Sequence, residues 1–221
     1  MLLKLKQNTP AWLKWRERRA TGTKLEKMIP SSGILPKIGF FEYAAESLAI
    51  ETDDEDPRAR GRRLEPEARE LLGKEVGINF TDDFVIESDD IDRLALSPDG
   101  LYIGKKYIIG CEIKCLAPKN HLEALYINMQ FNKGIKCFPR SNYLKNIGIP
   151  AEYIRQAVGY FIVEPKLETL YFTFYCPDLT VKQLFYIKIN RSDIKDIIEE
   201  QTIETKNILQ TAYDFISELS F

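Results

Sequence analysis

The sequence of 221 residues has little of what most metal-binding and redox proteins use. It contains one histidine, His121, so a metal site built from two or more histidines is excluded within one chain. Its four cysteines form no Cys-x-x-Cys pair, and their spacing fits neither a zinc site nor an iron–sulfur cluster. We therefore expect free thiols and a structural histidine. Any chemistry must then use carboxylates, lysine or hydroxyl groups.

Long apolar runs and a strong charge imbalance are also missing. No apolar segment approaches the roughly 20 residues that a membrane-spanning helix needs, and the first six residues are too mixed for a secretion signal. The formal net charge is −2, which argues against a uniformly basic surface for nucleic acid. The expectation is a cytoplasmic protein without a membrane segment.

The chain has the length of one large domain and contains no internal repeat. We expect a single unit over residues 1–221, with a helical segment at about 9–50, a core at about 58–189 and a C-terminal helix at about 192–219. Helices come first, and short β-prone runs with helices between them follow. This order predicts an α/β fold with one central mixed β-sheet flanked by helices.

Individual elements follow from periodicity and turn residues. The expected strands are residues 84–87, 101–103, 107–115, 170–176 and 184–189. The expected helices, besides the terminal ones, are residues 40–50, 65–74 and 152–163. In the C-terminal helix an apolar stripe is predicted to face the core, formed by Ile194, Ile197, Ile198, Ile208, Leu209, Ala212, Ile216 and Leu219.

A candidate active site lies in two adjacent predicted strands. If they form a hairpin with a two-residue loop, paired positions sum to 211, and Asp99 lies opposite Glu112. Lys105 and Lys106 are poor turn residues, so a slip of one residue stays open. Because side chains alternate along a strand, Glu112 and Lys114 project from one face, and Cys111, Ile113 and Cys115 from the other.

This pairing brings two carboxylates and an ammonium group together, since directly paired residues have Cβ atoms about 4.5–5.5 Å apart. Two close carboxylates repel, and a divalent cation between them relieves the repulsion. All-oxygen ligands favour Mg²⁺ or Mn²⁺. Lys114 would orient or deprotonate the attacking water, so the pattern predicts phosphodiester cleavage. Taken alone, Pro98-Asp99-Gly100 also indicates an ordinary turn.

Asp99 followed at hairpin spacing by Glu112-x-Lys114 resembles the PD-(D/E)XK nuclease signature. The surrounding segments resemble one branch of it, the phage lambda exonuclease or YqaJ-type viral recombinase family, which implies a restriction-endonuclease-like core. The matching segments, in the family's order, are Trp12-x-x-x-Arg16 with Thr21-Gly22-Thr23, residues 61–69, and Gln156-x-x-x-Tyr160.

The resemblance implies roles for these residues. Asp99, Glu112, the backbone carbonyl of Ile113 and Glu65 would be metal ligands, and Lys114 and Gln156 would serve catalysis beside them. Arg16 and Thr23 would bind DNA phosphate, with Tyr160 in support. Alternatives stay open from the residues alone: Glu65 as the cap of a helix that Pro66 starts, Gln156 and Tyr160 as ordinary helix packing, and Arg16 as a solvated side chain.

The implied activity is that of a Mg²⁺-dependent DNA exonuclease, with Mn²⁺ as a substitute and one or two ions bound. It would degrade linear double-stranded DNA from 5′ to 3′ in phage-type recombination, beside a single-strand annealing protein and as a homo-oligomer, a trimeric ring. The alternatives are a structure-specific or restriction-type endonuclease of the same fold, and a non-catalytic DNA-binding module.

DNA contacts are expected from local basic groups, because the net charge is slightly negative. The candidates are residues 14–27, residues 58–63, and Lys133, Lys136, Arg140 and Lys145. The acidic stretch at residues 82–92 is expected to face away from DNA.

Overall fold

The computed structural model describes residues 10, 14, 35, 37–50, 56–91 and 94–219. Arg16 and Thr23, the expected phosphate-binding residues, lie outside the described residues, as do nearly all of the helices expected before residue 37.

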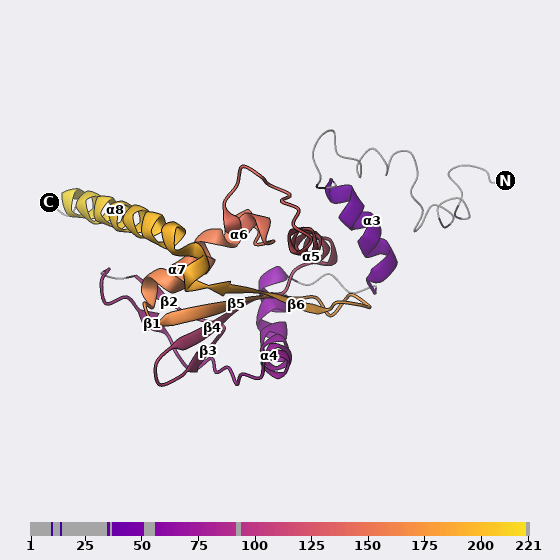
Figure 1. The fold of residues 1–221 in the computed structure, drawn as a ribbon, viewed down its shortest axis with the longest axis horizontal. Helices are drawn as coiled ribbons and strands as arrows, with labels where there is room; N and C mark the ends of the chain where they lie inside the picture. Colours follow the sequence, from indigo (N-terminus) through magenta and orange to yellow (C-terminus); the bar gives the residue numbers. More distant parts are fainter. Residues whose placement is uncertain are drawn as a thin grey trace.

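A mixed sheet of four strands lies at the centre of the fold (Figure 1). Its spatial order is β3 (Gly100–Ile103), β4 (Ile108–Lys114), β5 (Leu167–Tyr175) and β6 (Leu184–Asn190). The β4–β5 pair is parallel, and the two outer pairs are antiparallel. The predicted mixed sheet is confirmed. A separate two-stranded sheet joins β1 (Ile86–Glu87) to β2 (Ala95–Leu96), and β2 was not predicted.

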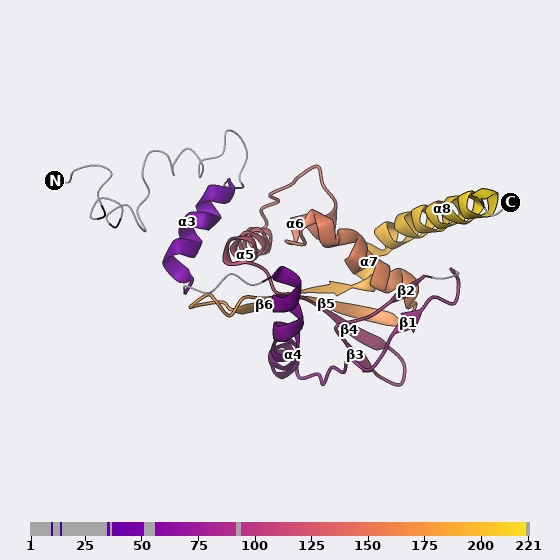
Figure 2. The same ribbon diagram turned by 180° about the vertical axis from the view of Figure 1, so that it is seen from behind.

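Helices cover both faces of this sheet (Figures 1 and 2). On one face lies α4 (Pro57–Val76). The other face carries α5 (Pro118–Asn132), α6 (Tyr143–Asn146), the 3₁₀ turn η1 (Ala151–Tyr153) and α7 (Ile154–Val163). Beside α5 lies α3 (Ile38–Leu48), and after β6 the turn η2 (Arg191–Ile194) leads into α8 (Lys195–Leu219).

Alternation along β5 divides the core into two layers. Leu170, Phe172 and Phe174 are fully buried against α7 and its neighbours. Tyr171 and Tyr175 point the other way and pack with residues of α4. Because both faces of the strand are covered, its sequence is nearly continuously apolar, as expected for a central strand.

The helix α4 begins earlier than its periodicity predicted. Asp56 caps it, with Oδ2 accepting a hydrogen bond of 2.9 Å from the Ala59 amide, and Pro57 occupies the first turn. Pro66 therefore lies inside the helix. The predicted start near Glu65 is wrong, and so is the alternative that Glu65 caps a helix begun by Pro66.

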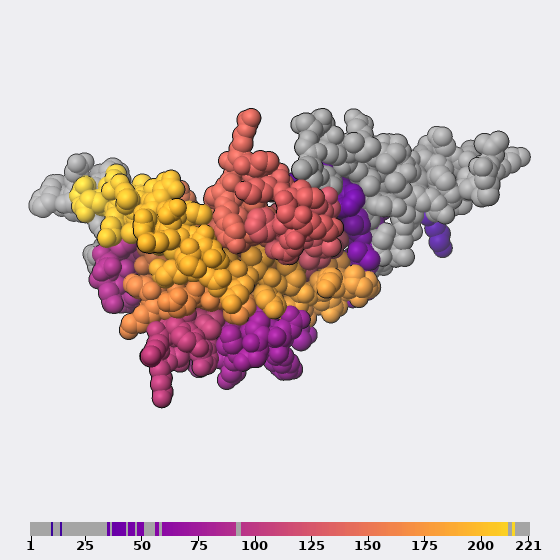
Figure 3. All heavy atoms as spheres, viewed as in Figure 1, coloured from indigo at the N-terminus to yellow at the C-terminus, as the bar shows by residue number. Residues whose placement is uncertain are grey.

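The apolar stripe of α8 is only partly buried. Ile194 and Ile198 belong to the core, whereas Ile208 is 65% exposed. Figures 1 and 3 show that the C-terminal part of α8 extends beyond the sheet, which accounts for the exposure of Ile208. The prediction of a core-facing stripe over the whole helix is wrong for Ile208; the side chains of Ala212, Ile216 and Leu219 lie outside the described part. No helix in the described ranges is long and apolar enough to span a membrane.

His121 and the cysteines have the structural character expected of them. His121 is fully buried on α5, its Nε2 lies 2.9 Å from the Lys182 carbonyl oxygen, and its ring meets Phe185 edge-on. Burial lowers the pKa of His121 to about 4, so the ring is neutral near pH 7. All four cysteines are free.

Replacing Pro66 by alanine should stabilise the protein. Proline in a helix interior removes a hydrogen bond and disfavours the helix by about 3 kcal/mol, and Pro66 is exposed, so little packing is lost. We expect the free energy of unfolding in urea to rise by about 1–3 kcal/mol. The matched control is Glu75→Ala, also exposed on α4. A lower stability of Pro66→Ala would show that the proline is needed to shape the helix.

Candidate active site

The hairpin of β3 and β4 has the predicted register. Gly100 pairs with Cys111, Leu101 with Gly110 and Ile103 with Ile108, so every pair sums to 211. The Gly104 amide donates to the Tyr107 carbonyl at 3.0 Å, which leaves Lys105 and Lys106 as the two turn residues. The one-residue slip that the lysines left open does not occur. Asp99, just before β3, therefore lies at the level of Glu112.

Glu112 is the most heavily bonded side chain of the site. It is 2% exposed and projects from β4 toward α7. Lys114 Nζ donates to its Oε1 at 2.5 Å, and Gln156 Nε2 donates to the same oxygen at 2.6 Å. The Tyr160 hydroxyl donates to Oε2. Three donors thus compensate the burial of this carboxylate, as a buried charge requires.

Gln156 and Tyr160 face the sheet from α7. Both side chains donate to the carboxylate of Glu112. The catalytic role expected of Gln156 stays a prediction. Because Tyr160 is 1% exposed and its hydroxyl points to Glu112, it does not offer this hydroxyl to a DNA phosphate.

Asp99 is a second, partly buried carboxylate. Its Oδ2 accepts a hydrogen bond of 2.7 Å from the Ile113 amide. Burial, and next the negative charge of Glu112, raise the pKa of Asp99 to about 7, and the charge of Glu65 acts in the same direction. The site therefore holds more negative charge than Lys114 neutralises, which is the electrostatic setting in which carboxylates bind a cation.

The oxygens of this site fit a hard divalent cation. Among the hydrogen bonds of the described residues, none reaches Oδ1 of Asp99, and Oε2 of Glu112 accepts only one. Each carboxylate thus has a lone pair to offer, as Mg²⁺ and Mn²⁺ prefer. The part of the chain described here contains no group of three or more His, Cys, Asp or Glu side chains placed to hold a metal. The ligand roles of Asp99, Glu112, Glu65 and the Ile113 carbonyl stay predictions.

Arg69 supports Asp99 and was not predicted as a functional residue. From α4 its Nη1 donates to the Asp99 backbone carbonyl at 2.5 Å, and its Nη2 pairs with Oδ2 of Asp82 at 2.5 Å. Asp82, in the acidic stretch expected to face away from DNA, holds this arginine. The signal available in the sequence was the i, i+4 spacing of Glu65 and Arg69, which places both on one side of a helix.

Arg60 has a similar supporting role at the end of β4. It donates to the Cys115 carbonyl at 2.8 Å and pairs with Asp178 at 2.6 Å, and both charged side chains are at most 15% exposed. The expectation that it contacts DNA with the rest of residues 58–63 is wrong for this side chain. Arg60 instead fixes the backbone just after Lys114.

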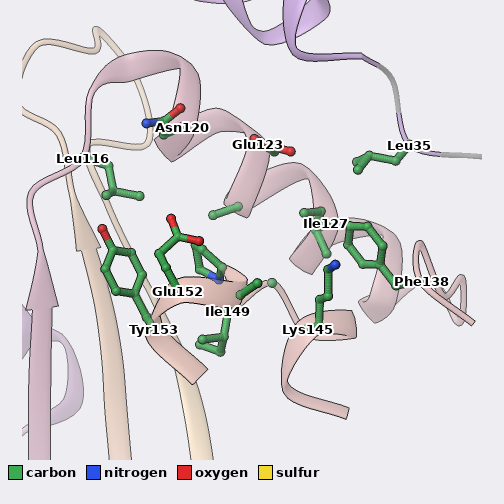
Figure 4. A pocket seen from close by; sticks show the side chains of 14 residues that line it. Leu35, Leu116, Asn120, Glu123, Ile127, Phe138, Lys145, Ile149, Glu152 and Tyr153 are labelled. Atoms are coloured by element: carbon green, nitrogen blue, oxygen red, sulfur yellow. The ribbon is translucent and has the colours of Figure 1, made fainter. Parts of the chain in front are cut away.

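A cavity of about 340 Å³ adjoins these residues (Figure 4). It lies between α5, α6 and η1, and Leu116 and Tyr153 form part of its wall. The Nζ atom of Lys114 lies 4.9 Å from the centroid of the Tyr153 ring. Tyr153 therefore belongs both to the cavity wall and to the surroundings of Lys114.

Comparison with known proteins agrees with this architecture. LHK-Exo, an alkaline exonuclease from Laribacter hongkongensis, superposes with a TM-score of 0.50 over 96% of this chain and 98% of its own, at 20% identity. The structure of LHK-Exo in complex with dAMP gives a TM-score of 0.51 with the same identity and coverage. No curated protein gives a significant match. The fold is thus that of an alkaline exonuclease, a restriction-endonuclease-like α/β core.

The family is defined more closely by sequence. The model of the YqaJ-like viral recombinase domain matches residues 11–166, which is most of the chain. The protein belongs to this family, as the motifs around Asp99, Glu112 and Lys114 indicated.

The raised pKa of Asp99 predicts how stability depends on pH without divalent cations. The folded protein keeps a proton that the unfolded chain releases above about pH 4. The free energy of unfolding should therefore fall as pH rises from about 4 to about 7 and then level off. Urea unfolding in EDTA at pH 5, 6, 7 and 8 measures this effect. In Asp99→Asn the free energy of unfolding should fall less between pH 5 and pH 7 than in the wild type. An identical pH dependence in the variant and the wild type would contradict the raised pKa of Asp99.

Arg69→Met should weaken cation binding without removing a ligand. The methionine keeps the packing of the side-chain stem but no longer holds the Asp99 carbonyl, and a hydrogen bond from a charged group contributes about 1.5–3 kcal/mol. We expect the Kd for Mn²⁺, measured by calorimetry, to rise about tenfold. The control is Arg155→Met, an exposed arginine of α7 that pairs with Glu204. Equal Kd values for the two variants would exclude the positioning role.

Proposed function

We propose that this protein is a divalent-cation-dependent DNA exonuclease that hydrolyses linear double-stranded DNA from 5′ to 3′ in phage-type recombination. The observation that carries the proposal is the convergence of Asp99, Glu112 and Lys114 at the level predicted by the hairpin register. Membership of the YqaJ-like viral recombinase family supports it.

The cation site would consist of Asp99, Glu112, the Ile113 carbonyl and Glu65, with one or two ions of Mg²⁺ or Mn²⁺. When bound, the cation supplies charge neutralisation at the phosphate and a more acidic water. Asp99 gives up its proton to bind it, because a ligating carboxylate must be ionised. Gln156 and Tyr160 keep Glu112 in one orientation, so that its remaining lone pair has a fixed direction.

Lys114 has the position to act on the substrate. Its Nζ is held between the Glu112 carboxylate and the Tyr153 ring, and its side chain is 19% exposed. An ammonium group there stabilises the negative charge that develops on the phosphate during attack by water. It also orients that water by hydrogen bonding, or takes its proton once Lys114 itself is neutral.

DNA ends and other partners complete the proposal. Arg16 and Thr23 would bind the phosphate at the 5′ end, with exposed basic side chains along the duplex. A single-strand annealing protein is the proposed partner, a trimeric ring the proposed assembly, and the cytoplasm the proposed location. These features are supported by the family resemblance.

Linear and covalently closed circular duplex DNA, each with Mg²⁺ or with EDTA, test the function. We expect the wild type to release nucleotides from linear DNA only, and only with Mg²⁺. Lys114→Ala and Glu112→Gln should lower the rate by about a hundredfold or more, because the first removes the positive charge at the reacting phosphate and the second removes an ionised ligand of the proposed cation site. Lys74→Ala is the control, an exposed lysine on α4.

The other outcomes identify the alternatives. Nicking of the circle would indicate an endonuclease of the same fold. DNA binding without cleavage in Mg²⁺ or Mn²⁺ would indicate a non-catalytic module. Full activity of Lys114→Ala would contradict the mechanism.

A further inference from the structure

The cavity beside Lys114 is within reach of a nucleotide bound at the active site. Leu116, two residues after Lys114 along the chain, lines it, and so does Tyr153, whose ring centroid lies 4.9 Å from Lys114 Nζ. Figure 4 shows Tyr153 and Glu152 next to each other on η1, with Glu123 on α5 across the cavity. The cavity is therefore one side chain away from Lys114, which is within the span of a nucleotide whose phosphate lies at Lys114.

The walls of the cavity combine apolar surface with polar and charged side chains. Leu116, Ala124, Ile127 and Ile149 supply apolar surface. Glu152 beside Tyr153 and Glu123 across the cavity supply carboxylates, and Lys145 Nζ lies 4.3 Å over the Phe138 ring. Sites for small organic groups combine apolar surface with placed polar groups, and the volume lies at the lower end of their range of about 300–1,000 Å³.

The two carboxylates decide which part of DNA fits. Burial, and next the charge of Glu152, raise the pKa of Glu123, so the pair is electrostatically unfavourable as it stands. A phosphate group would add to the repulsion. A flat base whose N–H groups donate to these oxygens would relieve it, and carboxylates accept hydrogen bonds from exocyclic amino groups of bases.

We propose that this cavity receives the base of the nucleotide whose phosphate lies at Asp99, Glu112 and Lys114, and that Glu123 and Glu152 favour bases with an exocyclic amino group. The inference rests on the proposed nuclease function and adds a base preference to it. Adenine, cytosine and guanine carry such a group, and thymine does not. The base enters unpaired, since its amino group is otherwise occupied by its partner in the duplex.

The test compares adenine with purine, which lacks only the amino group. Two linear duplexes differ in a run of deoxyadenosine or purine deoxyriboside in the strand to be hydrolysed. Purine pairs more weakly with thymine, so easier strand opening alone would make the purine strand faster. We expect the wild type to hydrolyse the adenine run faster, by about tenfold, the effect of a hydrogen bond to a charged group.

Variants assign this preference to the carboxylates. Glu123→Ala/Glu152→Ala should reduce the adenine-to-purine ratio to one or below. Glu199→Ala/Glu200→Ala carries the same change in charge on exposed positions of α8 and should keep the wild-type ratio. The single variant Glu152→Ala, at an exposed position, should lower the ratio even if the double variant is unstable. A wild-type ratio of one or less, or an unchanged ratio in Glu152→Ala and in the folded double variant, would overturn the proposal.

A binding measurement separates this proposal from the nuclease function. Fluorescence anisotropy with Asp99→Asn in Mg²⁺ compares labelled single strands of deoxyadenosine and purine deoxyriboside. About tenfold tighter binding of the adenine strand, lost when Glu123→Ala/Glu152→Ala is added, supports the cavity as a base site even if the wild type cleaves no DNA. Equal affinities for the two strands would overturn it, whatever the wild type cleaves.

Discussion

The site depends on one buried carboxylate being fully compensated. Glu112 lies in the interior at 2% exposure, and its two oxygens receive hydrogen bonds from Lys114, Gln156 and Tyr160. An uncompensated charge at this depth would destabilise the fold by several kcal/mol (about 3–5 for a broken buried pair). The donors come from the same strand and from α7, so this interaction fixes the helix against the sheet and gives the carboxylate a defined direction. A rigid ligand is what a small cation with strict geometry needs.

The opposite face of the sheet supports the same site through α4. Arg69 holds the backbone at Asp99, and Arg60 holds the backbone just after Lys114, so the two arginines fix both strands of the hairpin from one helix. Neither arginine needs to contact DNA for this purpose. The arrangement explains how a site with two close carboxylates stays ordered. The repulsion between Asp99 and Glu112 is opposed by the arginine hydrogen bonds to the backbone from α4 and by the three hydrogen bonds to Glu112 on the other face. The adjoining cavity is built on the same scaffold, because α5 follows β4 and η1 leads directly into α7.

Sequence patterns predicted the parts of the structure that local rules determine. Strand alternation and a two-residue loop were sufficient to place Asp99 opposite Glu112, and the structure confirms that register. The start of α4 was missed because Pro66 resembles a helix start, although the capping pair Asp56 and Pro57 lies upstream. The partners of Tyr160, Arg60 and Arg69 could not be predicted, since each is distant in the sequence and periodicity says only which way a side chain points. For α8 the spacing of the apolar residues correctly predicted a helix. The spacing alone does not reveal whether another part of the protein covers Ile208.

The most direct test of the central claim is the anomalous scattering of Mn²⁺ in crystals of the protein. If Asp99 and Glu112 form the cation site, a peak will lie within about 2.0–2.3 Å of an oxygen of each carboxylate, with Oε2 of Glu112 as the ligand because Lys114 and Gln156 occupy Oε1. Soaks of Tyr160→Phe then show whether the hydroxyl directs that choice of oxygen. A peak elsewhere, or none at these residues at saturating Mn²⁺, would contradict the account.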